Sequence, residues 1–349
     1  MPERLVDEAA FRAALLAWFD ENGRDLPWRG ETDPYRIWVS EIMLQQTRTE
    51  TVKLYYRRFL EALPDVFALA GADDEKLMKL WEGMGYYSRV RSLKKAAVRV
   101  VHEYGGKLPD TREELLKLEG IGAYASGAIA SIAFGRTEPA LDGNQARALS
   151  RLMDIEDEIR SPAALYDTAK TLMDRARPGD YNQALMGLGA TVCLPKNPAC
   201  GRCPVRAWCR AYALDRQKEL PKLPQKPEKK SVRAAVALVV NGSSVLVIRR
   251  PQKGVLSGMW AFPTFEGALD AASVEEALGE TGIRARFVRE IGENEHVFTH
   301  IVWHMRGYLF EGSGDGFIPA EKLREIAMPA AYRPYRQYIE ENFIKSFAL

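Results

Sequence analysis

The four cysteines of this 349-residue chain all lie between positions 193 and 209. Their spacing, C-x6-C-x2-C-x5-C, brings Cys193, Cys200, Cys203 and Cys209 within 17 residues. Thiols gathered so tightly in one short stretch are more typical of a metal site than of a disulfide framework. Four thiolates suit either a tetrahedral zinc ion or a [4Fe–4S] cluster, and the ligand chemistry alone leaves both groups open.

A second candidate site lies between Leu118 and Asp142. The capping box at residues 111–114 predicts a short helix that carries Leu118, and Gly120 and Gly122 predict its end because Gly accepts positive φ without steric cost. The next helix begins at once, so its unpaired N–H groups form an anion site that suits a DNA phosphate. Asp142 follows in a Pro- and Gly-flanked loop, where a lone carboxylate has no obvious packing role. Without Asp142, an ordinary helix hairpin is the better interpretation.

Positive charge is concentrated beside the cysteines. The chain as a whole has a net charge of only +2, but residues 196–233 contain eleven Lys or Arg against three Asp or Glu. A solvated linker explains part of this excess, and a patch that follows a phosphate backbone explains it better. Affinity for nucleic acid must come from such a local patch, because the bulk charge is near zero.

Hydrophobic periodicity predicts that residues 7–210 are almost entirely helical. Residues 214–231 are rich in Lys, Pro, Gln and Glu, which is typical of an exposed linker. Further along, an Asn241-Gly242 turn between two apolar runs predicts a β-hairpin. Ser273 is expected to cap a helix, and residues 286–310 are expected to form strands. The predicted fold is therefore mainly α, with a helical domain over 1–213, an interdomain linker over 214–231 and an α+β domain over 232–349.

The composition is that of an ordinary soluble globular protein, with 28% charged and 46% hydrophobic residues. Met1–Glu8 carries charges where a signal peptide needs an apolar run, and no apolar segment approaches the roughly 20 residues of a membrane helix. We therefore expect a cytoplasmic protein without a membrane partner. We also expect a monomer that is associated with the nucleoid.

Three further motifs are Leu26-Pro27-Trp28-Arg29, the segment Trp38–Thr47 and Gly83-Met84-Gly85-Tyr86-Tyr87-Ser88-Arg89. Together with the helix hairpin and the cysteine spacing, they closely resemble the adenine-specific MutY family of the helix-hairpin-helix DNA glycosylases. The resemblance covers essentially the whole chain. It implies a [4Fe–4S] cluster on the four cysteines, and it implies double-stranded DNA with A:8-oxoguanine or A:G mispairs as the partner.

In that family, the Glu matching Glu41 protonates the adenine and the Asp matching Asp142 stabilises the sugar cation. The chemistry requires such a pair. Adenine leaves poorly until a ring nitrogen is protonated, so a carboxyl with a raised pKa is needed. The broken glycosidic bond leaves an oxocarbenium-like sugar that needs an anion nearby. Asn144 matches a position that orients the catalytic Asp. Taken alone, Glu41 would more often be a surface glutamate.

Tyr124 separates two related chemistries. Bifunctional relatives that resemble endonuclease III have a Lys in this place, and its amine attacks the sugar. A phenol cannot form a Schiff base, so the resemblance implies monofunctional hydrolysis with water as the final nucleophile. Gln183 falls where some relatives have Glu, which puts any acid role there in doubt.

The resemblance also implies contacts with DNA and with the extruded base. Tyr86 and Gln46 match positions that wedge into the base stack when the adenine is flipped out. Without the resemblance, a core aromatic at the end of a helix is as good an interpretation of Tyr86 as a DNA contact. The remaining expected contacts are Trp28, Arg29, Leu44, Thr47, Arg89, Gly120, Gly122 and Gln183.

The C-terminal domain is similar to Nudix folds through Gly258–Pro263 and the helix after Ser273. It lacks the Glu cluster with which Nudix hydrolases hold divalent metal, so we expect a Nudix-like shape without hydrolysis. His296, His300 and His304 would share one face of a strand but lie roughly 13 Å apart, too far to bind one ion. The triplet Phe298, Thr299 and His300 instead matches the Phe-Ser-His loop with which the family recognises 8-oxoguanine, and Thr replaces Ser here.

The sequence therefore predicts a monofunctional adenine DNA glycosylase of base excision repair. Three alternatives carry less weight. Tyr124 disfavours a bifunctional pyrimidine-lesion glycosylase. The intact pair Glu41 and Asp142 disfavours an iron–sulfur DNA-binding protein without catalysis. The missing Glu cluster disfavours a nucleotide-pool hydrolase that works through the C-terminal domain.

Overall fold

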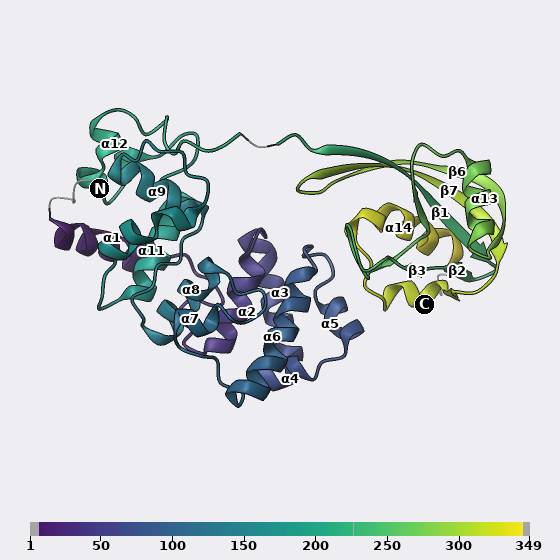
Figure 1. Ribbon diagram of the computed structural model, residues 1–349, viewed down its shortest axis with the longest axis horizontal. Coiled ribbons are helices and arrows are strands. Elements are labelled where there is room, and N and C mark those ends of the chain that lie inside the picture. The colour runs from purple at the N-terminus through teal and green to yellow at the C-terminus, as the bar shows by residue number, and fades with distance from the viewer. Residues whose placement is uncertain (1–6, 226, 345–349) are drawn as a thin grey trace. The chain divides into compact units, whose positions relative to one another are not determined.

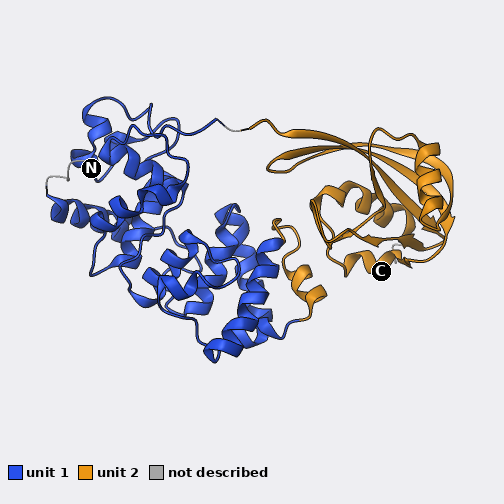
Figure 2. Cartoon of the chain, in the orientation of Figure 1, with its two compact units in different colours: residues 1–72, 88–225 blue, residues 73–87, 226–349 orange. Residues whose placement is uncertain are grey.

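The computed structural model describes residues 7–225 and 227–344. The chain forms two compact units, one from residues 1–72 and 88–225 and the other from residues 73–87 and 226–349 (Figures 1 and 2). The last boundary falls inside the stretch that the sequence predicts as a linker. The assignment of residues 73–87 to the second unit is not apparent from helical periodicity.

Helices dominate the first unit, as predicted. In the described ranges 7–225 and 227–344, none is long and apolar enough to cross a membrane. The helices of the first unit are α1 (Glu8–Asn22), α2 (Pro34–Leu44), α3 (Thr49–Ala62), α4 (Val66–Ala70), α6 (Ser88–Tyr104), α7 (Arg112–Leu115), α8 (Ala123–Phe134), α9 (Gly143–Met153), α10 (Tyr166–Leu172), α11 (Pro178–Thr191) and α12 (Arg210–Ala213), with the 3-10 turns η1 (Pro162–Leu165), η2 (Cys200–Arg202) and η3 (Arg206–Trp208).

A hydrophobic core joins α1, α9, α10 and α11 to the cysteine loop. The Phe11 ring of α1 contacts Tyr181 and Trp208 edge-on, with ring centroids 6.5 Å and 6.3 Å apart. Edge-to-face aromatic pairs add about 0.5–1.5 kcal/mol to the area they bury. The irregular loop at 193–209 is thus packed onto the helices by its own aromatic residue.

A side-chain cap sets the start of α7 where the sequence predicts it, since Thr111 accepts a hydrogen bond from the Glu114 N–H. Ser161 likewise caps η1, which begins at Pro162. The expectation that Leu118 lies on the helix capped by Thr111 is wrong, because α7 ends at Leu115.

The second unit contains α5 (Asp74–Leu80) and a six-stranded mixed sheet. The sheet order is β6-β7-β1-β2-β8, and β5 also pairs with β1. Strand β1 is parallel to β7, whereas β2 and β5 are antiparallel to β1. The strands are β1 (Lys230–Asn241), β2 (Ser244–Leu246), β5 (Thr264–Glu266), β6 (Arg284–Val297), β7 (Ile301–Ser313) and β8 (Phe317–Pro319), and β3 (Ile248–Arg249) pairs with β4 (Trp260–Ala261) in a separate two-stranded sheet.

Alternate residues of β1 face two separate cores. Val236 and Leu238 pack with helix α14 (Arg333–Phe343), while Ala237 and Val239 pack with α13 (Ala271–Glu280). This arrangement follows from the two-residue period of a strand. The central strand is covered on each face, which explains its almost continuous apolar sequence.

The predicted hairpin is confirmed, since Asn241 pairs with Ser244 and Gly242 has a φ of 58°. The predicted cap of α13 is wrong. Asp270 caps this helix by accepting a hydrogen bond from the Ser273 N–H, so Ser273 lies inside the first turn. Either residue type can cap a helix, and only the backbone conformation decides between two candidates three positions apart.

Candidate functional site

Glu41 lies on the buried face of α2 and is 5% exposed. Asp33 caps this helix by accepting from the Tyr35 N–H, and Pro34 occupies its first position. Burial raises the pKa of Glu41 to about 7, the nearby charge of Asp142 acts in the same direction, and the Tyr124 hydrogen bond and Arg29 act against them. Glu41 is therefore not a surface glutamate, and a large fraction of it is protonated near neutral pH.

Tyr124 lies in the first turn of α8, directly after the glycine turn. Its hydroxyl donates a hydrogen bond to Glu41 Oε2 and lies 3.8 Å from Met186 Sδ. Burial and the adjacent Glu41 carboxylate hold the pKa of Tyr124 well above its usual range. The phenol therefore keeps its proton and fixes one oxygen of Glu41, which leaves Oε1 for another partner.

Asp142 is the N-cap of α9. Its Oδ1 accepts from the Gln145 N–H at 2.7 Å and its Oδ2 accepts from Asn144 Nδ2 at 2.9 Å. Burial raises the pKa of Asp142, and these hydrogen bonds act in the opposite direction. The expectation that this carboxylate has no packing role is wrong, because it also starts a helix. Asn144 contacts Asp142 as the sequence predicts.

Arg147 extends this hydrogen-bond chain to the cysteine loop, and the sequence does not single it out. Its Nη2 donates to Asn144 Oδ1 at 2.9 Å, and its Nε donates to the Cys193 carbonyl at 2.8 Å. Gly189 of α11 makes the approach possible, since a Cβ there would lie 2.7 Å from the Asn144 Cβ. Asp142 and the cysteine loop are thus held in one network of helix-end contacts.

Arg29 and Gln183 form a second polar pair near Glu41. Arg29 Nη1 donates to Gln183 Oε1 at 2.6 Å, and the guanidinium lies 4.6 Å from the centre of the Phe19 ring. Burial lowers the pKa of Arg29, although a guanidinium keeps its charge in proteins. Trp28 is buried against Tyr56, edge to face, so it supports this region from the core.

Arg89 organises the turn after α2. Its guanidinium donates to the carbonyls of Ile42 and Met43 at 3.0 Å, to the Gln45 carbonyl, and to Thr47 Oγ1 at 3.0 Å. A cation is favourable at this helix C-terminus. The result is a fixed turn in which Leu44 is half-buried and Gln46 is exposed.

Gln46 and Tyr86 have left-handed backbone conformations, with φ of 56° and 48°. Residues other than Gly, Asn and Asp seldom adopt this region, and such strain gathers at ligand-binding sites. Tyr86 is 45% exposed despite its large ring. Gln46 in the first unit and Tyr86 in the second are each presented to solvent by an unfavourable backbone conformation.

The predicted glycine turn is confirmed at Gly120 only, because Gly122 is extended, with a φ of −95°. Gly120 has a φ of +80°, and a Cβ there would lie 2.7 Å from the Ser92 Cβ. Gly122 begins α8 with no side-chain cap, so the first N–H groups of this helix lack that partner. Both glycines are exposed. The turn offers backbone donors to an anion on a surface free of side chains.

The four cysteines surround one small cavity of about 30 Å³. All four are half-buried free thiols. Burial raises the pKa of Cys203 to about 12 and that of Cys209 to about 11, and the neighbouring sulfurs add to each shift. A bound cation would offset this cost of ionisation and allow all four sulfurs to bind it as thiolates. The donor set therefore fits a metal group bound by four thiolates.

Arg151 is a buried cation beside these thiols. Its Nη1 donates to Cys193 Sγ at 3.3 Å and to the Leu194 carbonyl at 2.7 Å, and its Nε donates to the Leu220 carbonyl at 2.8 Å. One side chain thus connects the cysteine loop with the start of the segment that leads to the second unit.

In the second unit, residues 298–300 form the turn between β6 and β7. Phe298 packs edge-on against Trp303, with ring centroids 5.2 Å apart, while Thr299 and His300 are exposed. The Thr299 hydroxyl and the Tyr86 hydroxyl share a hydrogen bond of 2.9 Å. The structure therefore brings together two predicted contact residues that are 213 positions apart.

Glu75 and Glu82 hold the segment 73–87 within the second unit, and the sequence does not single them out. Glu82 Oε1 accepts from the Met328 N–H at 3.0 Å and from Arg336 Nη1 at 2.8 Å. Glu75 Oε2 accepts from Trp260 Nε1 at 3.0 Å. These contacts place the Gly-Met-Gly-Tyr loop that carries Tyr86.

One acidic side chain of the Nudix-like helix α13 makes a structural hydrogen bond. Glu275 Oε2 accepts from the Phe287 N–H at 3.0 Å. The three histidines are divided among β6, the turn and β7, so they do not share one strand. His296 packs on Phe298 and His304 lies 3.3 Å from Glu295. None of these contacts resembles a metal site.

Comparisons with known proteins agree with this architecture. Residues 39–173 match the HhH-GPD superfamily of base excision DNA repair proteins, residues 193–209 match the iron-sulfur binding domain of endonuclease III, and residues 235–338 match a NUDIX domain. An adenine DNA glycosylase of Mus musculus is 37% identical over 85% of this chain and 70% of its own length. The corresponding enzyme of Homo sapiens is 36% identical over 88% of this chain and 68% of its own length.

Among solved structures, a thermostable thymine-DNA glycosylase is 29% identical, with a TM-score of 0.55 over 60% of this chain and 97% of that protein. An endonuclease III–DNA complex shares the fold of the helical part, with a TM-score of 0.52 at 20% identity over 60% of this chain and 99% of that protein. The match at residues 193–209 decides between the two groups that four thiolates allow. The cysteines hold a [4Fe–4S] cluster.

We expect purified protein prepared without oxygen to contain iron and inorganic sulfide in equal amounts and no zinc. The cluster makes the loop a rigid element, because each cysteine is tied to a common centre. Metal analysis with visible absorption spectroscopy measures this directly. The same preparation of a Cys203→Ser variant serves as the control, and stoichiometric zinc in the native protein would contradict the assignment.

Proposed function

We propose that this chain, which belongs to the adenine DNA glycosylase family, removes adenine that is mispaired with 8-oxoguanine or guanine in duplex DNA. Membership makes the chain a DNA glycosylase of base excision repair, a hydrolase that acts on an N-glycosidic bond. The observation that carries the proposal is the group of the buried Glu41 with the half-buried Tyr124 and Asp142 in the helical unit, where one carboxyl has a pKa of about 7.

Glu41 acts in this proposal as the general acid. A group whose pKa lies near the working pH is protonated often enough to donate and acidic enough to transfer its proton. Tyr124 occupies Oε2, so the proton is delivered from Oε1 to a ring nitrogen of the extruded adenine. Arg29 and Gln183 line the same region as a fixed polar pair that can hydrogen-bond the base edge.

Asp142 acts as the counter-charge. When the glycosidic bond breaks, positive charge develops on the sugar, and a fixed, half-buried carboxylate stabilises it more strongly than water does. Asn144 and the Gln145 N–H hold the carboxylate in one orientation. Water then attacks the sugar, since no amine stands at the position of Tyr124.

We expect that borohydride does not trap the native enzyme on DNA, whereas Tyr124→Lys becomes trappable. The Lys amine would occupy the place of the phenol beside Glu41 and form a Schiff base with the sugar. Tyr124→Phe is the matched control, because it removes the hydroxyl without adding a nucleophile. Gel analysis of borohydride-treated complexes measures the outcome, and strand cleavage by the native protein without heat or base would speak against a monofunctional mechanism.

The DNA backbone is held at two places in the helical unit. The exposed turn at Gly120 and Gly122 donates backbone N–H groups to a phosphate. Basic residues in 196–233 follow the backbone further along, other than Arg210, Arg216 and Lys222, which lie at the acidic loop 154–159. Gln46 fills the space that the flipped base leaves, and its strained exposed position supports this role. Leu44, Thr47 and Arg89 fix the turn that carries it.

The second unit reads the base opposite the adenine. Thr299 and Tyr86 form one hydrogen-bonded pair on an exposed surface, and Phe298 supports the turn from below. His300 is exposed beside them and offers a donor to the base or to a phosphate. A hydroxyl pair can rearrange to accept or donate at the edge where guanine and 8-oxoguanine differ.

We expect Thr299→Ala to reduce the preference for A:8-oxoguanine over A:G by about 5- to 150-fold, which corresponds to the 1–3 kcal/mol of one good base contact. Thr299→Ser is the matched control, since it keeps the hydroxyl and removes only a methyl group. Single-turnover rates on the two duplexes give the ratio. An unchanged ratio in Thr299→Ala would place lesion reading elsewhere, most directly at Tyr86.

The test of the whole proposal is single-turnover excision on a panel of duplexes that differ only in the base opposite adenine. We expect the fastest release from A:8-oxoguanine, slower release from A:G and very slow release from A:T. Equal rates across the panel would refute the mispair specificity, and release of a pyrimidine base would refute the assignment of adenine.

A further inference from the structure

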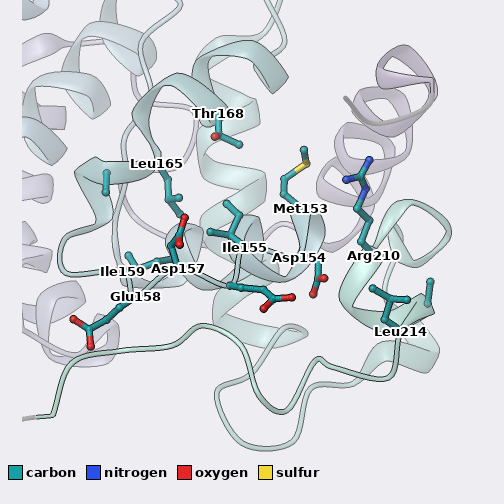
Figure 3. A pocket seen from close by; sticks show the side chains of 13 residues that line it. Met153, Asp154, Ile155, Asp157, Glu158, Ile159, Leu165, Thr168, Arg210 and Leu214 are labelled. Carbon is teal, nitrogen blue, oxygen red and sulfur yellow. The ribbon is translucent and has the colours of Figure 1, made fainter. Parts of the chain in front are cut away.

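A groove of about 850 Å³ opens in the helical unit (Figure 3), and its lining includes neither Glu41 nor the glycine turn. The end of α9, the following loop at residues 154–159, η1 with α10, and α12 form its walls. Met153, Ile159 and Leu165 are buried members of the core and make its floor apolar. Leu214 stands at the rim and is 59% exposed. Such a volume lies within the usual range of ligand-binding pockets, about 300–1,000 Å³.

The wall of this groove is acidic. Four carboxylates occupy five consecutive positions, in the sequence Asp154-Ile155-Glu156-Asp157-Glu158, and all four line the groove together with Arg210. The stretch 196–233 is strongly basic, so the acidic wall of the groove has the opposite charge to the stretch that adjoins it. Carboxylates repel phosphates, so nucleic acid is excluded as the occupant.

The loop already binds one basic segment of its own chain. Arg216 pairs with Asp154 at 2.9 Å and with Glu156 at 2.5 Å, and Lys222 lies 3.9 Å from Glu156. The Ile159 N–H donates to the Lys222 carbonyl at 2.9 Å, which adds a backbone contact. An irregular segment rich in Lys, Leu and Pro is thus accommodated on this loop.

Part of the loop remains uncovered. Among the described residues, Asp157 has no ion-pair partner, and Glu158 pairs only with Arg160, whose side chain is 87% exposed. Carboxylates and apolar side chains together therefore face an open groove.

We propose that this groove docks a short basic segment of a partner protein, in which Leu- or Ile-type side chains alternate with Lys or Arg. The apolar side chains occupy the floor at Met153 and Leu165, and the cations pair with Asp157 and Glu158. The chemistry repeats what Arg216–Lys222 does on the other part of the loop. Docking at this site brings a partner to the glycosylase without competing for the DNA surface.

The test is fluorescence polarisation with the intact, cluster-containing protein and a labelled short peptide of alternating Lys and Leu. We expect saturable binding that weakens by at least about tenfold in the charge-reversal variant Asp157→Lys/Glu158→Lys. Leu214→Ser, at an exposed rim position, should weaken it by a smaller factor. The matched control is Glu50→Lys/Glu61→Lys on α3, which reverses two exposed carboxylates elsewhere and should leave binding unchanged.

Single-turnover adenine excision should be unaffected in all these variants, which separates the groove from the proposed function. A duplex competitor should not displace the peptide. Failure of the native protein to bind the peptide would overturn the proposal, as would equal binding by both charge-reversal variants. Equal affinity for a peptide of Lys and Ser would show that the apolar floor is not used. Self-association that the groove variants abolish would assign the groove to a second copy of this chain.

Discussion

Replacement of Glu41 by Gln is expected to lower the single-turnover rate of adenine excision by about 100- to 10,000-fold, the range that general-acid help contributes. Gln keeps the size of the side chain and an oxygen for the Tyr124 hydroxyl, but it carries no transferable proton. Duplex binding should remain near the native level, because the glycine turn and the basic stretch lie outside this change. Excision assays and filter binding on the same A:8-oxoguanine duplex measure the two effects.

The pH dependence gives an independent test of the same role. Burial raises the pKa of Glu41 to about 7, and only the protonated form donates. The excision rate of the native enzyme should therefore fall as pH rises through about 7. Tyr124→Phe removes the hydrogen bond that lowers this pKa, so its descending limb should move to higher pH. A native profile that is flat between pH 6 and pH 9 would contradict Glu41 as the acid.

Asp142→Asn is expected to lower excision by about 100- to 1,000-fold, the usual loss when one fixed electrostatic contact to a transition state is removed. Asn is as good an N-cap as Asp, so α9 should keep its start and the protein its stability. Asp142→Ala is the informative comparison, because it removes the cap together with the charge and should cost a further ~1 kcal/mol of folding free energy.

Thermal unfolding and excision rates, measured on both Asp142 variants, separate the two roles. Nearly native excision by Asp142→Asn would mean that the carboxylate serves only as a cap. Nearly native unfolding with lost excision is the result that a counter-charge predicts.

Local patterns in the sequence predict the helix hairpin, the cysteine loop and the Asn241-Gly242 turn well. Each is specified by residues within one short stretch, through backbone freedom at Gly or through ligand spacing. The partners of these stretches are not predictable in the same way. Arg147 hydrogen-bonds Cys193 across 46 positions, and Arg29 hydrogen-bonds Gln183 across 154. Hydrophobic periodicity within a short stretch cannot predict pairs so far apart in the sequence.

Asp142 and Trp28 illustrate the same limit. Asp142 is expected to lack a structural role, and only its extended backbone and the Gln145 N–H reveal the cap. Trp28 is expected at the DNA, yet it packs in the core against Tyr56, and its proposed contact with DNA stays a prediction. An aromatic residue in a motif serves packing or binding equally well, and its burial is a tertiary property.

The make-up of the second unit has a consequence for the order of folding. Its sheet and flanking helices come from one continuous stretch, whereas Glu82 meets Arg336 across 254 positions. Closing so long a loop costs entropy before any contact repays it, so the segment 73–87 joins a sheet that has already formed. The hydroxyl pair of Tyr86 and Thr299 is therefore expected to form only after the sheet has closed around its own strands.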